Sequence, residues 1–76
     1  MVDRETVKQK MASLLKQPVT RLEDTTGLID LVTDSFLLVE MVIELQEEFG
    51  VRMVQEDLNH VKTVSDLTEL VSARAG

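Results

Sequence analysis

The chain has 76 residues and a formal net charge of −6, with two phenylalanines and no cysteine, tyrosine or tryptophan. This length allows one small domain, and an apolar content of 43% is typical of a folded chain rather than a disordered one. The lack of cysteine excludes disulfides and thiolate metal sites, and the acidic balance with few aromatic rings disfavours binding to nucleic acid.

The sequence shows no sign of membrane insertion or export. No apolar run reaches the ~18 residues that a transmembrane helix needs. A charged segment, Asp3-Arg4-Glu5, stands where a signal peptide would have its apolar region. We therefore expect a cytoplasmic protein without membrane contact, built as one free-standing domain over residues 1–76.

Acidic residues are concentrated in the middle of the chain. Between Arg21 and Arg52 there are eight aspartates and glutamates and no lysine or arginine. One interpretation is a solvated face that keeps the protein soluble. The other is an electric field that steers basic partners toward this segment.

The first predicted helix spans residues 3–16. Its apolar residues recur at helical spacing: Val7, Met11, Leu14 and Leu15. Asp3 is a suitable N-cap, and we expect Pro18 to stop the helix because proline disfavours helical geometry at the preceding residue. Residues 17–34 show no sustained period and predict a long ordered loop, pinned by its apolar residues Leu22, Leu28, Ile29 and Leu31.

The second predicted helix spans residues 35–49, with Asp34 as N-cap and Gly50 in a left-handed conformation after its end. At about 100° per residue, one face is apolar and should lie in the core: Leu38, Met41, Val42, Leu45 and Phe49. The opposite face is acidic and contains Glu40, Glu44, Glu47 and Glu48.

Three large apolar residues, Phe36, Leu37 and Ile43, fall on the acidic face or at its edge. Exposed apolar groups rimmed by charge suggest a surface for a partner. The alternative is that Phe36 and Ile43 are tucked under the preceding loop. The pattern leaves the two possibilities open for Phe36 and favours the partner surface for Leu37.

The remainder of the chain predicts one short helix and one longer helix. Residues 55–61 allow one or two helical turns, and Thr63-Val64-Ser65-Asp66 has the form of a capping box that opens the last helix. Residues 51–54 are the one strand candidate and have no strand to pair with. The predicted fold is therefore all-α, a small bundle of three main helices and one short helix, with a long loop between the first and second helices.

No catalytic or metal site emerges from the sequence. The single histidine, His60, lies in a polar turn, and there is no second histidine or cysteine to complete a catalytic triad or a zinc site. The paired carboxylates Glu47 and Glu48 lie on an open helix face, where nothing excludes water. We expect no enzymatic activity and no bound metal.

Asp34-Ser35 has two compatible interpretations. Both residue types are common at helix starts, so the pair can serve as a cap. Ser35 should also be exposed, and without a base of its own it is suited to modification by another enzyme. A phosphate attached there would lie near a helix N-terminus, which favours anions.

The segment from Thr33 to Gly50 resembles acyl carrier proteins. That family carries Asp-Ser-Leu at the start of its second helix, then a Val-Glu-Leu run and a Glu-Glu-Phe ending, which Asp34-Ser35-Phe36, Val39-Glu40-Met41 and Glu47-Glu48-Phe49 match in type. The resemblance continues without gaps over residues 28–71. It departs from the family at Phe36, where leucine is usual, at Val32, often glycine, and at Val54, often proline.

The resemblance implies that Ser35 receives a 4′-phosphopantetheine arm from coenzyme A through a magnesium-dependent phosphopantetheinyl transferase. The thiol of the arm would carry acyl groups as thioesters between enzymes. Asp34 would help to present Ser35 and to meet the transferase. The face that partner enzymes read would comprise Phe36, Leu37, Glu40, Met41, Glu44, Glu47 and Glu48.

The implied partners, besides the transferase, are an acyltransferase, an acyl-loading ligase, a ketosynthase or other biosynthetic enzymes with basic docking patches, and the protein itself would be a monomer. The departures favour a polyketide or hybrid polyketide–peptide pathway. The alternatives are a peptidyl carrier, a carrier of fatty-acid synthesis or, from another class, an unmodified helical protein-interaction module.

Overall fold

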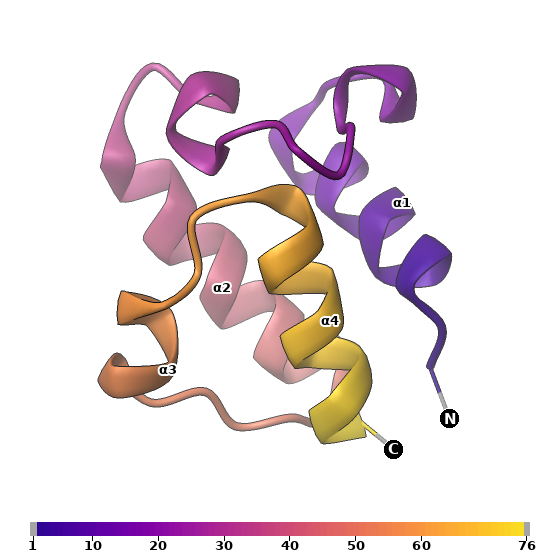
Figure 1. Cartoon of the computed structure of the whole chain (residues 1–76), viewed down its shortest axis with the longest axis vertical. Coiled ribbons are helices and arrows are strands. Elements are labelled where there is room, and N and C mark those ends of the chain that lie inside the picture. Colours follow the sequence, from indigo (N-terminus) through magenta and orange to yellow (C-terminus); the bar gives the residue numbers. More distant parts are fainter. Residues whose placement is uncertain (1, 76) are drawn as a thin grey trace.

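The computed structural model describes residues 2–75, which form a bundle of helices with one long connection, between α1 and α2 (Figure 1). Its elements are, in chain order, α1 (Arg4–Leu15), the 3₁₀ turns η1 (Val19–Arg21) and η2 (Leu28–Leu31), α2 (Ser35–Phe49), α3 (Gln55–Asn59) and α4 (Val64–Ala75). Over residues 2–75 there is no strand, only an isolated bridge between Gly27 and Thr63. The predicted all-α fold with three main helices and one short helix is confirmed.

Helix α1 begins and ends within one residue of its predicted bounds. Oδ1 of Asp3 accepts hydrogen bonds from the backbone N and the Oγ1 of Thr6, each at 2.8 Å. The helix ends at Leu15 because Lys16 adopts a left-handed conformation with φ of 56°. The N–H of Gln17 then bonds to the carbonyl of Ala12 at 3.0 Å. The helix therefore ends within one residue of the predicted bound and before Pro18, and the αL turn at Lys16 closes it.

The connection between α1 and α2 is more ordered than the predicted loop, because it contains η1 and η2. Leu22, Leu28 and Leu31 are buried and anchor it to the core. Ile29, also expected to be an anchor, is 60% exposed. In the 3₁₀ turn η2 only part of the surface faces the bundle, and Leu28 and Leu31 occupy that part.

Backbone hydrogen bonds tie this connection to the start of α4. The N–H of Leu28 donates to the carbonyl of Lys62 at 2.9 Å, and the N–H of Val64 donates to the carbonyl of Thr26 at 3.0 Å. These bonds satisfy polar backbone groups that the bundle covers. They also fix where the chain enters η2 and, a few residues later, α2.

Helix α2 has the predicted bounds. Oδ1 of Asp34 accepts a hydrogen bond from the backbone N of Phe36 at 2.9 Å, and Gly50 closes the helix with φ of 63°. Met41 and Leu45 are buried, while Leu38, Val42 and Phe49 are partly buried against the same core. The predicted core face of this helix is confirmed.

The last two helices are capped by side chains from their own first turns. Oδ2 of Asp57 accepts from the N–H of Val54 at 3.0 Å at the start of α3. The predicted capping box opens α4, because Thr63 Oγ1 accepts from the N–H of Asp66 and Asp66 Oδ2 accepts from the N–H of Thr63, each at 3.2 Å. Val64, Leu67 and Val71 are fully buried where α4 packs against α1 and α2.

Candidate functional site

Ser35 is the first residue of α2, and its side chain is exposed. Asp34 caps the helix, so the cap does not require the serine hydroxyl. Among the hydrogen bonds of residues 2–75, none involves the hydroxyl group of Ser35. The structure therefore presents a hydroxyl group to solvent at a helix start that is already stabilised by its neighbour.

The start of α2 is electrostatically suited to an anion. The first helical turn contains no acidic residue. The N–H groups at a helix N-terminus carry partial positive charge, and the dipole of a helix of 15 residues adds to it. The carboxylate of Asp34 is directed to the backbone N of Phe36. A phosphate ester on Ser35 would lie within this favourable field.

Within residues 2–75, no histidine, aspartate or glutamate side chain is hydrogen-bonded to the hydroxyl group of Ser35. His60 is the C-cap of α3 and lines a shallow surface depression together with Asp57 and Asp66, a set that does not include Ser35. A serine needs a neighbouring base to become a nucleophile by itself. Within residues 2–75 there is also no group of three or more histidine, aspartate or glutamate side chains that could hold a metal ion.

Phe36, Val39 and Ile43 form an exposed apolar stripe on α2. The sequence pattern places the first and last of these on the acidic face or at its edge. Phe36 is 63% exposed and Ile43 is 49% exposed, so the alternative that they are tucked under the preceding loop is wrong. Val39, which was not among the predicted surface residues, is 53% exposed. Helical spacing could have revealed it, because Val39 lies three residues after Phe36 and four before Ile43.

The acidic residues of α2 lie beside this stripe. Glu40, Glu44 and Glu47 are exposed and take part in none of the ion pairs of residues 2–75. Glu48 lies 3.7 Å from Nζ of Lys10 on α1. Three of the four predicted carboxylates are therefore available to a basic partner.

Met41 requires a correction. The family resemblance places it on the face that partners read, but its side chain is only 2% exposed and belongs to the core. The reason is its angular position on α2, one turn before the fully buried Leu45. Leu37, in contrast, is 43% exposed and remains on the surface.

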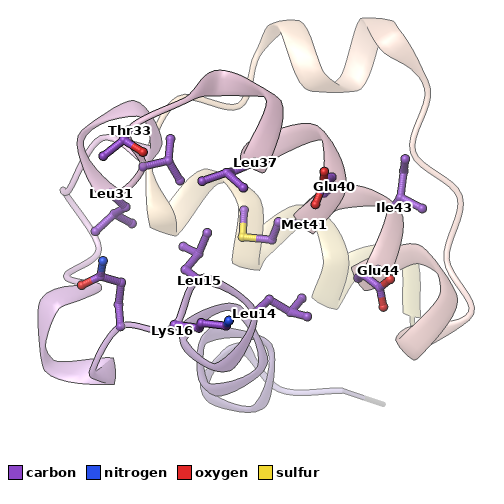
Figure 2. Close-up of a pocket in the computed structure, with 12 residues that line it drawn as sticks. Leu14, Leu15, Lys16, Leu31, Thr33, Leu37, Glu40, Met41, Ile43 and Glu44 are labelled. Carbon is purple, nitrogen blue, oxygen red and sulfur yellow. The ribbon is translucent and has the colours of Figure 1, made fainter.

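An open groove of about 650 Å³ lies between the end of α1 and the first half of α2. Figure 2 shows Leu15 on α1 pointing toward Leu37 and Met41 on α2. This groove was not predicted from the sequence, because its walls come from separate segments, residues 14–17, 31–33 and 37–44.

None of the helices in residues 2–75 combines the length and the apolar character that crossing a bilayer requires.

Comparison with known proteins agrees with this arrangement. The family model described as the phosphopantetheine attachment site matches residues 5–71. The chain is 26% identical over 76 residues to polyketide-8 synthase acyl carrier protein 2 of Streptomyces avermitilis, which covers 99% of this chain and 87% of the relative. It is 30% identical over 81 residues to the acyl carrier protein of Thermotoga maritima, with complete coverage of both chains.

A third relative is the chloroplastic acyl carrier protein of Brassica napus, 34% identical over 73 residues, which cover 90% of this chain and 54% of that protein. A small helical bundle with an exposed serine at a helix start is consistent with the scaffold of a carrier protein. The chain belongs to the acyl carrier protein family, whose members carry 4′-phosphopantetheine covalently.

Proposed function

We propose that Ser35 is the attachment residue and that the arm's thiol carries acyl intermediates as thioesters. The observation that supports this most directly is the exposed Ser35 hydroxyl at the N-terminus of α2, where Asp34 already supplies the cap. In the attachment step, Oγ of Ser35 forms a bond to the phosphorus of the phosphopantetheine group. The phosphoanhydride bond of coenzyme A breaks, adenosine 3′,5′-bisphosphate leaves, and a base of the transferase takes the hydroxyl proton.

This chain's own residues fit the phosphodiester that results. Its negative charge would lie at the N-terminus of α2, where the backbone N–H groups and the helix dipole favour an anion. The first turn of α2 contributes no carboxylate to repel it. Asp34 holds the first turn in place and acts as a positioning residue for the hydroxyl group.

The surface of α2 is the proposed docking site for the transferase and for the acyltransferase, ligase or ketosynthase that act on the cargo. Its unpaired glutamates would steer basic patches, and the exposed Phe36 and Leu37 would supply apolar contact. We propose further that the protein is a monomeric, non-enzymatic carrier of the cytoplasm.

The proposed pathway is polyketide or hybrid polyketide–peptide biosynthesis. Phe36 follows the serine with a larger side chain than the leucine usual there and is exposed, which alters the surface that partner enzymes meet. The Streptomyces avermitilis relative has polyketide synthase in its name, whereas the Thermotoga maritima relative is named as an acyl carrier protein without a pathway. Fatty-acid synthesis is the second candidate.

The deciding experiment is the intact mass of the protein after incubation with coenzyme A, magnesium and a broad-specificity phosphopantetheinyl transferase. Wild type and Ser13→Ala, which removes another exposed serine, should each gain one phosphopantetheine. Ser35→Ala should gain none. A gain on Ser35→Ala, or no gain on wild type with two unrelated transferases, would overturn the assignment and favour the unmodified interaction module.

The pathway is tested with the modified protein. Malonyl-loaded wild type and Phe36→Leu are offered to a bacterial fatty-acid ketosynthase and to a polyketide ketosynthase. Poor elongation of wild type by the fatty-acid enzyme, improved by Phe36→Leu, would support the polyketide role. Equal elongation of both forms by the fatty-acid enzyme would favour fatty-acid synthesis.

A further inference from the structure

Three carboxylates of α2 form a row along the side of the helix that adjoins α1. Glu40, Glu44 and Glu48 follow one another at intervals of four residues, a spacing that makes them neighbours on a helix surface. The first two line the groove between α1 and α2 (Figure 2), and the third lies beside Lys10 of α1. We name these three glutamates the acidic row.

The last carboxylate of the acidic row is paired with a cation of the protein itself. Oε1 of Glu48 lies 3.7 Å from Nζ of Lys10, whereas Glu40 and Glu44 take part in none of the ion pairs of residues 2–75. The side chains of Lys10 and Glu48 are 33% and 52% exposed, so water and a partner protein can reach both charges. The pair is therefore open to competition.

A basic partner that docks on the acidic row meets Lys10 as a competitor. Its own lysine or arginine has to displace the ammonium group of Lys10 before it can pair with Glu48, and the two cations repel each other as it approaches. Glu40 and Glu44 present no such obstacle. The ion pair thus shortens the row that a partner meets from three free carboxylates to two.

Lys8 gives a matched comparison on the same helix. Its Nζ lies 3.1 Å from Oδ1 of Asp24, in the connection between α1 and α2. The carbonyl of Asp24 accepts a hydrogen bond from the N–H of Ser65 in the first turn of α4. Replacing either lysine by glutamine changes the net charge by the same amount, but only the loss of Lys10 uncovers a carboxylate of the acidic row.

We propose that Lys10 weakens the docking of basic enzymes on α2 by competing for Glu48, an inference that rests on the proposed function. The partner is an enzyme that presents lysines or arginines to α2. An ion pair between exposed side chains favours its closed form by about two- to fivefold, so its loss strengthens docking by a similar factor. Lys10 acts through Glu48 and is therefore a positioning residue.

The test measures kcat/KM for attachment of phosphopantetheine by a transferase with a basic docking surface. Lys10→Gln should raise kcat/KM about two- to fivefold, through a lower KM with kcat unchanged. Lys8→Gln should give a smaller rise, because it changes the net charge without uncovering the acidic row. Lys10→Arg, which keeps the charge, should match wild type.

A variant that combines Lys10→Gln with Glu48→Gln identifies the source of the gain. Its kcat/KM should return to the wild-type value, because the carboxylate that Lys10→Gln uncovers is gone. Raising the salt from about 0.1 to 1 M shortens the Debye length from about 10 to 3 Å and should also remove the difference between wild type and Lys10→Gln.

Three results would overturn the competition by Lys10: no gain in Lys10→Gln, an equal gain in Lys8→Gln, or a gain that persists in the combined variant. The melting temperature of each variant shows that it is folded. Failure of the transferase to modify any form would instead overturn the proposed function. Forms that are all modified at the same rate would overturn the role of Lys10 and leave the attachment site intact.

Discussion

Asp57 and Arg74 join the short helix α3 to the last turn of α4, with Oδ1 of Asp57 only 2.7 Å from Nη2 of Arg74. The other carboxylate oxygen of Asp57 accepts from the N–H of Val54, and Nη1 of Arg74 donates to the carbonyl of Arg52 at 2.9 Å. One ion pair thus holds the start of α3 and the segment before it to the end of the bundle, where Figure 1 shows α3 at the periphery.

Breaking this ion pair should increase the local unfolding of α3 more than that of the other helices. Arg74→Gln should raise the amide exchange rates of residues 55–59 about fivefold and leave those of α1 unchanged, because the side-chain hydrogen bonds of Arg74 within residues 2–75 go to Arg52 and Asp57 and not to α1. Arg4→Gln is the control, since it breaks the Arg4–Glu69 pair, in which both side chains are 59% exposed. Equal effects of the two variants on α3 would contradict this role.

The capping box of α4 should make the stability of the protein depend on pH. Hydrogen bonds from the backbone N–H groups of Lys62 and Thr63 hold the pKa of Asp66 below its ordinary value of 3.8. A carboxyl group whose pKa is lowered in the folded state stabilises that state above the unfolded pKa and loses this effect as the pH falls through the folded pKa.

The test for Asp66 is the difference in melting temperature between wild type and Asp66→Asn. This difference should be constant from neutral pH down to about pH 5. It should then shrink as the pH falls below 3.8, the ordinary pKa of the group. A difference that persists unchanged into strong acid would show that the charge of Asp66 contributes nothing.

Capping and modification at the start of α2 should be separable. Asp34→Ala should lower the free energy of unfolding by about 1 kcal/mol, because it removes the side chain that caps the helix. Ser35→Ala should change it by less than about 0.5 kcal/mol, since the serine is exposed and does not cap the helix. Urea denaturation measures both, and a larger loss for Ser35→Ala would contradict this division of roles.

The acidic segment should make the protein sensitive to salt. Eight carboxylates with no intervening lysine or arginine repel one another, and α1 offsets this only in part through Lys8–Asp24 at 3.1 Å and Lys10–Glu48 at 3.7 Å. Raising the ionic strength from about 0.01 to 0.15 M shortens the Debye length from about 30 to 8 Å. The melting temperature should therefore rise with sodium chloride or magnesium.

A variant with glutamine at the three unpaired glutamates of α2 serves as the control for this salt effect. At low salt its melting temperature should be higher than that of wild type, and it should rise less as salt is added. A wild-type melting temperature that does not change with salt would show that repulsion among these carboxylates is negligible. The variant is built at Glu40, Glu44 and Glu47.

The helix starts could be predicted from sequence because each depends on residues within one turn. The caps by Asp3 and Asp34 and the Thr63–Asp66 box form within three residues, so local sequence determines them. The attachment serine was predicted for the same reason, from a short motif at a helix start, and it stays a prediction until the mass experiment is made. The end of α1 was predicted to within one residue, although the αL turn at Lys16 that closes it was not predicted.

Tertiary packing decided which of the apolar residues outside the core face of α2 remain on the surface. Helical periodicity already places Met41 on the core face, but it leaves open whether the preceding loop covers Phe36 and Ile43, and only the packed structure shows that both are exposed. Packing also decided the groove between α1 and α2 and the Asp57–Arg74 pair, whose partners come from separate elements. Such contacts depend on how whole helices pack, and a single sequence does not specify that geometry through local interactions.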